Sequence, residues 1–195
     1  MDEEAPKVAK IIIIGESAVG KTCIAKRYFE NSFQSKVSET IGAGYFKTQV
    51  EIQGEMVDFV LWDTAGAERY RALTPLYFSN AAAAIVAYAI NDRKTFEELD
   101  SFIQLLNEKT ENILIYIVGN KNDLEEEREV EYIEGLNYSK KINAEHFLEV
   151  SALTGEGVNS LFESIICSPH IQFFQNAHMI DHENVKHQSD DKGCC

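Results

Sequence analysis

The stretch KVAKIIIIGESAVGKTCIAKRYFEN, residues 7–31, decides the fold of this chain. Its first part, residues 7–14, is an apolar run that predicts a strand, and residues 21–31 predict a helix. Between them, GESAVGKT fits G-x-x-x-x-G-K-[ST], the pattern of a phosphate-binding loop, in the required place between strand and helix. The glycines let the backbone curl so that successive N–H groups point at one phosphate, and the helix N-terminus adds positive potential. We therefore predict a β-phosphate site here rather than an incidental glycine turn.

Two side chains of this loop predict further contacts. Lys21 can bridge β- and γ-phosphate oxygens, and the Thr22 hydroxyl can bind Mg²⁺. Cys23 is interpreted as a small packed residue rather than a nucleophile. The predicted nucleotide contacts of the segment are Gly15, Glu16, Ser17, Ala18, Val19, Gly20, Lys21, Thr22 and Cys23.

The rest of the chain alternates between strand and helix patterns. Two β-type runs within residues 44–62 meet at Gln53-Gly54, which predicts a hairpin. Strands separated by helices form parallel βαβ units whose sheet is covered on both faces. The expected fold class is α/β, a phosphate-loop NTPase domain with a six-stranded, mostly parallel sheet, one antiparallel edge strand and helices on both faces. Further strands are predicted at residues 81–90, 112–120 and 146–152, and helices at residues 92–110, 131–142 and 157–168.

Composition excludes several classes of function. The 195 residues suit one domain, and the net charge of −14 leaves no basic footprint for a nucleic acid or for an anionic membrane surface. The start MDEEAPKVAK lacks the apolar core of a signal peptide. The four cysteines imply no disulfide framework, so a reducing cytosol is expected.

A second motif, DTAG, begins at Asp63, where an apolar strand ends. A carboxylate at this place can hold the Mg²⁺ shell, and the N–H of Gly66 can meet a γ-phosphate. The alternative is a turn with an Asx cap, because D-x-x-G is common by itself. The position of Asp63 at the end of the strand favours metal binding over a simple Asx-capped turn.

A third motif, NKND, follows the apolar strand ILIYIVG at the carboxyl edge of the predicted sheet, where ligands bind. The Asp123 carboxylate can accept two hydrogen bonds from N1–H and the 2-amino group of guanine, whereas adenine offers no such donor pair. Asn120 can reach the other edge of the base, and the Lys121 stem can lie over its face. A further motif, SAL, follows the next strand and can offer backbone N–H groups to guanine O6, or can be a simple Ser cap. Its residues are Ser151, Ala152 and Leu153.

These motifs, in this order, resemble those of the Ras superfamily of small GTPases across residues 7–168. Within it the chain resembles the Rab family, because GESAVGKT, ETIGAGYF, WDTAGAERYRALTPLYF, GNKNDL and the terminal GCC stand where Rab proteins carry their counterparts. It looks most like the branch that works on early endocytic membranes. The resemblance implies an enzyme that binds GTP or GDP with Mg²⁺, hydrolyses GTP, and recruits effectors in vesicular traffic while GTP-bound.

The resemblance also implies roles for single residues outside the motifs. Thr40 would bind Mg²⁺ only while the γ-phosphate is present, and Phe33 would lie near the guanine ring. Three aromatic residues would form the surface that reports the bound nucleotide to effectors, although core packing is an alternative for them. They are Tyr45, Trp62 and Tyr77.

Catalysis is where the chain departs from the family. Lys21 and Gly66 are present, but Ala67 stands where these proteins usually carry a glutamine that orients the attacking water. A methyl group can neither donate nor accept a hydrogen bond, so we expect intrinsic hydrolysis to be slower by roughly one to three powers of ten. Rab-directed GAPs bring both an arginine and a glutamine, so the missing group can arrive from outside.

The chain end predicts a lipid anchor. The double cysteine Cys194 and Cys195 resembles the Rab termini that are geranylgeranylated, and two chains give stable anchoring where one does not. Residues 169–195 are expected to be a flexible tail on a G domain of residues 7–168. Unmodified thiols are the alternative for the cysteines, and a metal site among the tail histidines is the less favoured reading of their spacing.

The implied partners are effectors, an exchange factor, a Rab-type GAP and a prenyl-protein chaperone, for a monomer on the cytoplasmic face of endomembranes with a soluble pool. A different class of function stays open. A chain without the catalytic glutamine could hold GTP persistently and act as a scaffold. A phosphate-loop kinase would not explain NKND.

Overall fold

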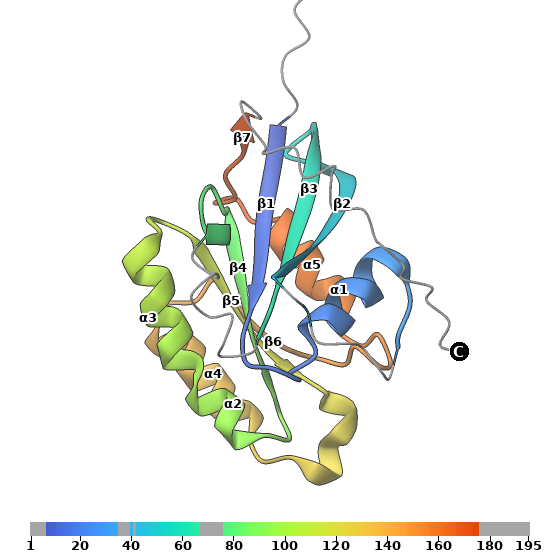
Figure 1. Ribbon diagram of the computed structural model, residues 1–195, viewed down its shortest axis with the longest axis vertical. Helices are drawn as coiled ribbons and strands as arrows, with labels where there is room; N and C mark the ends of the chain where they lie inside the picture. The colour runs from blue at the N-terminus through green and yellow to red at the C-terminus, as the bar shows by residue number, and fades with distance from the viewer. Residues whose placement is uncertain (1–6, 35–39, 41, 67–75, 176–195) are drawn as a thin grey trace, which may run out of the picture.

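The computed structural model describes residues 7–34, 40, 42–66 and 76–175. Its sheet has the strand order β2-β3-β1-β4-β5-β6, with a short β7 beside β1 (Figure 1). β2 pairs with β3 antiparallel at one edge, and the pairs β3-β1, β1-β4, β4-β5 and β5-β6 are parallel. The predicted α/β fold is confirmed. The strands are β1 (Lys7–Ile14), β2 (Ala43–Ile52), β3 (Glu55–Thr64), β4 (Ala83–Ala89), β5 (Leu114–Asn120), β6 (His146–Val150) and β7 (Phe174–Gln175).

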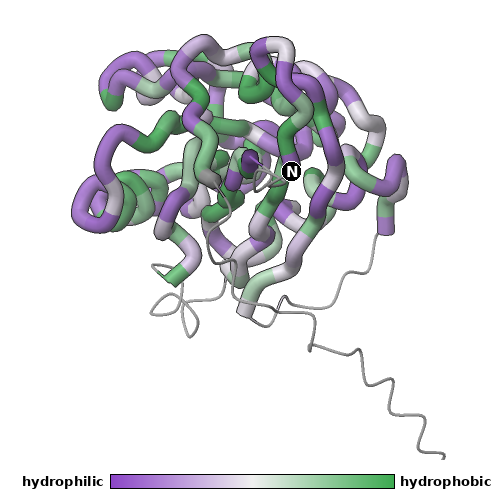
Figure 2. Tube along the Cα trace, turned by 90° about the horizontal axis from the view of Figure 1, so that it is seen from above, coloured by the Kyte–Doolittle hydropathy of each residue, from purple (hydrophilic) through white to green (hydrophobic). Residues whose placement is uncertain are grey.

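Helices cover both faces of this sheet (Figure 1). α1 and α5 pack on one face, with Ile24 and Leu161 in its core, and α2, α3 and α4 cover the other face, where Phe102 is buried. Polar and apolar stretches along the chain can be followed in Figure 2. The helices are α1 (Lys21–Glu30), α2 (Arg93–Glu97), α3 (Leu99–Lys109), the 3₁₀ segment η2 (Asn122–Glu127), α4 (Tyr132–Lys141) and α5 (Val158–Ile166).

The central strand β1 explains why its sequence is an unbroken apolar run. Ile11 and Ile13 point into the core on one face, and Ile12 and Ile14 into the core on the other. Since successive side chains of a strand alternate between faces, a strand buried on both sides needs apolar residues at every position. β1 is therefore packed on both faces, and its C-terminal end leads directly into the phosphate-binding loop.

The predicted hairpin turns where expected. Gln53 has φ 54° and Gly54 has φ 81°, so both central residues of the two-residue turn lie in the left-handed region. This is the backbone of a type I′ turn, whose twist matches that of the flanking strands. The hairpin carries β3 back beside β1, which brings Asp63 opposite Ile13.

Two boundaries differ from prediction. The expected helix at residues 92–110 is divided at Glu98, whose ψ of −8° tightens the backbone so that Ser101 N–H donates to Glu98 O three residues earlier. The expected flexible tail does not begin at residue 169. Ile171 is buried in the core beside α5, and β7 pairs antiparallel with Lys7 and Val8.

Among the described residues, no helix has both the length and the apolarity needed to cross a membrane. The described residues also contain no group of three or more His, Cys, Asp or Glu side chains placed to hold a metal ion. The tail histidines beyond residue 175 lie outside the described residues.

Candidate nucleotide and metal site

The phosphate-binding loop follows β1 and opens α1. Gly15 has φ 141°, and a Cβ there would lie 2.2 Å from the Ala87 carbonyl oxygen, so only glycine fits. The ammonium of Lys21 donates to the carbonyl oxygens of Gly15 at 2.9 Å and Glu16 at 2.7 Å. These two hydrogen bonds tie the Lys21 side chain, at the end of the loop, to the first two residues of the loop.

Burial shapes the charge of this lysine. Lys21 is 6% exposed, and desolvation lowers its pKa to about 8, although the nearby carboxylates of Asp63 and Glu16 oppose the shift. An ammonium that is buried among carbonyl dipoles gains from an added anion, because the anion restores the favourable field lost on leaving water. The loop is therefore suited to a phosphate.

Three oxygen-bearing side chains meet beside the loop. The Thr22 hydroxyl donates to Asp63 Oδ2 at 2.5 Å and lies 3.0 Å from the Thr40 hydroxyl, which is 3.5 Å from the same carboxylate oxygen. Asp63 is 1% exposed, and desolvation raises its pKa while hydrogen bonding from Thr22 and the charge of Lys21 act in the other direction.

This cluster fits Mg²⁺. Asp63 Oδ1 is buried and has no hydrogen-bond partner in the described part of the chain. A carboxylate and two hydroxyls are the hard oxygen ligands that Mg²⁺ takes, with water or phosphate completing the shell. An unpaired, buried carboxylate oxygen is costly, and a divalent cation beside it removes the cost.

The DTAG segment continues from Asp63 toward the loop. A Cβ on Gly66 would lie 2.3 Å from Lys21 Nζ and 2.6 Å from the Glu16 carbonyl oxygen. The N–H of Ala65 donates to the carbonyl oxygen of Gly42 at 2.9 Å, which joins this segment to the residues after Thr40. Gly66 is thus pressed against the phosphate end of the site.

A second group of side chains gathers at the ends of β5 and β6. Ser151 donates its hydroxyl to Asp123 Oδ1 at 2.5 Å. Asn120 donates its amide to the carbonyl oxygen of Val19 at 2.7 Å and accepts from the N–H of Ala152 at 3.1 Å. Asn120, which is 2% exposed, therefore ties the phosphate loop to the segment after β6.

These bonds modify one expectation. Asn120 was predicted to reach the base itself, yet its carbonyl oxygen and one amide hydrogen are used within the protein. The N–H groups of Ser151 and Ala152 likewise donate to Glu156 O and Asn120 Oδ1. Contact of Asn120, Ser151 and Ala152 with a base therefore stays a prediction.

One cavity of about 700 Å³ connects the two groups. Most of the predicted nucleotide contacts line it, while Gly15, Glu16, Val19 and Ser151 support it from behind through the hydrogen bonds above. Burial raises the pKa of the Cys23 thiol, in keeping with a packed residue. The lining residues are Ser17, Ala18, Gly20, Lys21, Thr22, Cys23, Phe33, Gln34, Thr40, Gly66, Asn120, Lys121, Asp123, Leu124, Ala152 and Leu153.

Sequence reasoning missed three residues of this site. Gln34 and Leu124 line the cavity, and each stands next to a predicted residue, which was the available signal. Arg27 in α1 donates to the carbonyl oxygens of Ala152 and Leu153, 125 and 126 positions away. No local pattern announces a contact at that separation.

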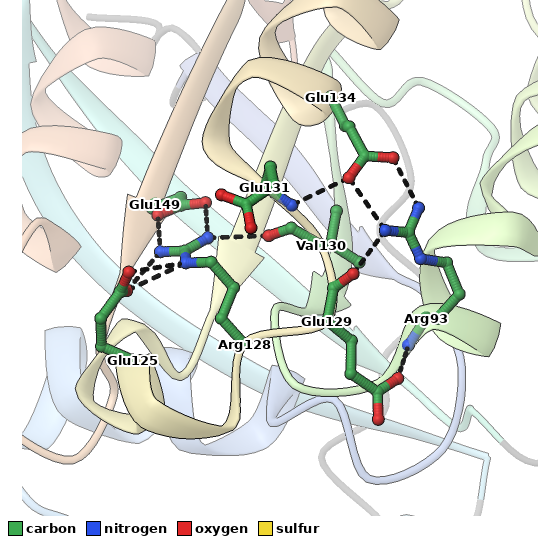
Figure 3. A network of polar contacts seen from close by, with 8 residues as sticks. All are labelled: Arg93, Glu125, Arg128, Glu129, Val130, Glu131, Glu134 and Glu149. Carbon is green, nitrogen blue, oxygen red and sulfur yellow. Dashed lines mark hydrogen bonds and ion pairs between the residues drawn. The ribbon is translucent and has the colours of Figure 1, made fainter.

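A polar network connects η2, the segment that contains Asp123, with β6 (Figure 3). Arg128 pairs through two nitrogens with both carboxylate oxygens of Glu149 in β6, each at 2.7 Å, and also with Glu125 in η2. Arg128 and Glu149 are each 10% exposed. This bidentate pair holds the segment that carries Asp123 against the strand that leads to Ser151.

Residues 10–169 match the sequence model of the Ras family. The chain belongs to the Ras family. Several of its relatives are Rab proteins. Ras-related protein Rab-22A of Homo sapiens is 40% identical over 157 residues, which cover 80% of each chain. Ras-related protein Rab-21 of Geodia cydonium is 37% identical over 160 residues, 82% of this chain and 69% of that protein. Ras-related protein Rab-11C of Dictyostelium discoideum is 40% identical over 166 residues, 85% of this chain and 74% of that protein.

The chain is accordingly a Rab-type small GTPase, an enzyme that binds GTP and GDP with Mg²⁺ and hydrolyses GTP. As such it is a GTP-binding regulator of membrane traffic, a class that works with effectors, exchange factors, GAPs and chaperones. The predicted membership of the Rab family is confirmed.

The three aromatic residues that this Rab-type GTPase was predicted to offer to effectors do lie together. The Tyr45 and Trp62 ring centroids are 5.5 Å apart, and those of Trp62 and Tyr77 are 5.4 Å apart. Tyr45 is 47% exposed, while Trp62 also packs partly on the core. Lys10 lies under Trp62, its ammonium 5.2 Å from the ring centroid. Trp62 thus packs against the core on one side and lies beside the exposed ring of Tyr45 on the other.

Three predicted residues of this Rab-type GTPase cannot be placed. Ala67 follows Gly66 but lies outside the described residues, as do Cys194 and Cys195. Their roles rest on the sequence alone.

Proposed function

We propose that this GTPase hydrolyses GTP slowly by itself, depends on a GAP to switch off, and recruits effectors to an early endosomal membrane while GTP-bound. The observation that carries the proposal is the convergence of Lys21 with the Thr22–Thr40–Asp63 cluster at one end of a cavity that has Asp123 at its other end. The intact site supports nucleotide binding, and Ala67 supports slow turnover.

In the proposed site each residue has a separate task. Lys21 holds β- and γ-phosphate oxygens, and the N–H of Gly66 donates to the γ-phosphate. Thr22, Asp63 and, in the GTP state alone, Thr40 would hold Mg²⁺. The ion would supply neutralisation of the charge that develops on the phosphate oxygens. Asp123 selects guanine by accepting from N1–H and the 2-amino group, with Phe33 and the Lys121 stem against the base.

Ala67 limits the chemical step in this proposal. Gly66 lines the cavity, and a Cβ on it would lie 2.3 Å from Lys21 Nζ, so the DTAG segment reaches the phosphate end of the site just before residue 67 in the sequence. A side chain there that can hydrogen-bond would orient the attacking water, and the alanine methyl cannot. Binding of nucleotide and metal depends on other residues and is retained.

A persistent GTP-bound scaffold is the second candidate, and Ala67 is the observation that favours it. Such a protein would use the same cavity and the same aromatic surface of Tyr45, Trp62 and Tyr77 without cycling. The two candidates differ in whether a GAP restores turnover.

Membrane attachment is proposed through Cys194 and Cys195. Two geranylgeranyl chains would anchor the protein, because the acidic tail gives no electrostatic attraction to anionic lipids. A prenyl-protein chaperone would maintain the cytosolic pool. The domain boundary is proposed after Gln175 rather than at residue 168, since β7 belongs to the sheet.

The test of the catalytic proposal is single-turnover hydrolysis of GTP by the full chain and by Ala67→Gln. The glutamine supplies the missing donor and acceptor, so the rate constant should rise by roughly 10- to 1000-fold. Ala67→Leu is the control, because it adds bulk without hydrogen-bonding capacity and should stay slow. Equal rate constants for the wild type and Ala67→Gln would contradict the proposal.

The same assay with a Rab-directed GAP domain separates the two candidates. A GAP that supplies its own glutamine should accelerate the wild type strongly and make the Ala67→Gln difference small. Failure of Rab GAPs to accelerate the wild type, while they accelerate Ala67→Gln, would favour the scaffold.

A further inference from the structure

Most of the backbone N–H groups of residues 151–154, which follow β6, donate hydrogen bonds to acceptors within the protein. Ser151 N–H donates to Glu156 O at 2.9 Å, Ala152 N–H to Asn120 Oδ1 at 3.1 Å, and Thr154 N–H to the Ser151 hydroxyl at 3.0 Å. Within the described residues, the N–H of Leu153 has no acceptor. It is the donor in this segment that a ligand can use without breaking a bond of the protein.

Arg27 controls the peptide groups on both sides of Leu153. Its Nε donates to the Ala152 carbonyl oxygen at 2.9 Å, and its Nη2 donates to the Leu153 carbonyl oxygen at 2.6 Å. A planar guanidinium that donates to two consecutive carbonyls fixes the rotation of both peptide planes, which a single-point donor would not.

The orientation of the Leu153 N–H follows from this grip. In a trans peptide the C=O and the N–H point in opposite directions. The Ala152 carbonyl points at Arg27, so the N–H of Leu153, in the same peptide group, points away from it. Ala152 and Leu153 line the cavity and Arg27 does not, so this N–H is directed to the cavity side.

We propose that Arg27 is a positioning residue for base selection, which holds the Leu153 N–H as the hydrogen-bond donor to the oxygen at C6 of guanine. The inference rests on the proposed placement of the base beside Asp123. Adenine carries an amino group at C6, and two donors would then face each other, so this contact adds a second rejection of adenine. Lys21 and Arg27 both belong to α1. One helix therefore carries the residue proposed to hold the phosphates and the residue proposed to position the base contact.

The test compares the affinity of the full chain for three diphosphates, measured with Mg²⁺ by displacement of a fluorescent GDP analogue. GDP is the reference. 6-Thio-GDP keeps N1–H and the 2-amino group but has a larger, weaker acceptor at C6. Inosine diphosphate keeps the C6 oxygen and lacks the 2-amino group, so it reports on Asp123 instead.

In Arg27→Met the preference for GDP over 6-thio-GDP should fall by roughly threefold to tenfold, the worth of one neutral hydrogen bond. The preference for GDP over inosine diphosphate should stay at the wild-type ratio, which a general loosening of the site would not allow. Arg27→Lys keeps the charge but only one donor point, and should give an intermediate ratio. Arg93→Met is the matched control, because Arg93 is also a helix arginine that donates to a backbone carbonyl, that of Glu129, away from the cavity.

The outcomes separate the inference from the proposed function. If the wild type does not prefer GDP over either analogue, the placement of the base at Asp123 is wrong. If the wild type does prefer GDP, and Arg27→Met and Arg27→Lys keep the wild-type ratio for 6-thio-GDP, the role of Arg27 is overturned while the site stands. Loss of both preferences together in Arg27→Met would also overturn it.

Discussion

Asp63 is a buried acidic residue that the described part of the chain does not fully satisfy. Its carboxylate is buried, one oxygen has no partner within the described residues, and burial raises its pKa. The Thr22 and Thr40 hydroxyls beside it cannot neutralise its charge. A bound cation is what this arrangement lacks, so nucleotide retention should depend on Asp63 through Mg²⁺.

Asp63→Asn should therefore abolish the effect of Mg²⁺ on nucleotide release. In the wild type, chelating Mg²⁺ should accelerate GDP release strongly; the variant should release GDP fast at millimolar Mg²⁺ and in chelator alike. Asp58→Asn is the matched control, because Asp58 is a buried aspartate of the same strand that pairs with Lys47 at 2.8 Å. Retained Mg²⁺ dependence in Asp63→Asn, measured by stopped-flow release, would show that the carboxylate does not serve the metal.

At the scale of elements, the segment from η2 to α4 is fixed by two arginines of very different exposure (Figure 3). Arg128 and Glu149 are each 10% exposed, whereas the side chains of Arg93 and Glu134 are 39% and 37% exposed. Hydrogen bonds to Glu149 and Glu125 raise the pKa of Arg128. Removing one partner of an ion pair that is mostly shielded from water costs more free energy than removing one partner of an exposed pair.

Arg128→Met should lower the free energy of unfolding by about 1–3 kcal/mol, because it leaves the largely shielded Glu149 carboxylate without its bidentate partner. Arg93→Met should lower it by about 1 kcal/mol or less. Urea unfolding of the GDP-bound proteins measures both. Adding Glu149→Gln to Arg128→Met should recover part of the loss, since the unpaired charge is then gone. A small effect of Arg128→Met, equal to that of Arg93→Met, would refute the account.

The element scale also shows where prediction from sequence works. The run at residues 7–14 and the turn at Gln53-Gly54 were readable because strand burial and turn geometry impose residue types directly. The division of the helix at Glu98 was not readable, because a local change of ψ leaves no pattern in residue type. The aromatic rings of Tyr45, Trp62 and Tyr77 were assigned to one surface by resemblance, and their side-by-side packing is a property of the fold.

At the scale of the whole molecule, the last described residues return to the start of the sheet. β7 pairs with the first residues of β1 (Figure 1). The lining residues of the cavity follow the carboxyl ends of β1, β5 and β6, at the opposite end of the sheet. Ile171 is 5% exposed, and Phe173 and Phe174 pack against the same core. The proposed lipid tether thus starts at the end of the molecule opposite the nucleotide.

Ile171→Ala should destabilise the domain by about 2–4 kcal/mol, as expected when a buried aliphatic side chain is truncated. Gln172→Ala, at the exposed neighbouring position, should change stability by less than about 0.5 kcal/mol. The midpoint of urea unfolding gives both values. Equal midpoints for the two variants would place this segment in the tail rather than in the domain.

The sequence by itself determined the phosphate-binding loop, the order of strands and helices, and the family. These depend on short patterns, since a loop that cradles phosphate or a strand buried on both faces restricts residue types within a few positions. Tertiary structure alone decided which distant residues meet. Thr22 finds Asp63 across 41 positions and Arg27 finds Ala152 across 125, and Ile171 enters the core. Such contacts follow from the strand order of the sheet, which places residues far apart in the sequence side by side and leaves no pattern among their sequence neighbours.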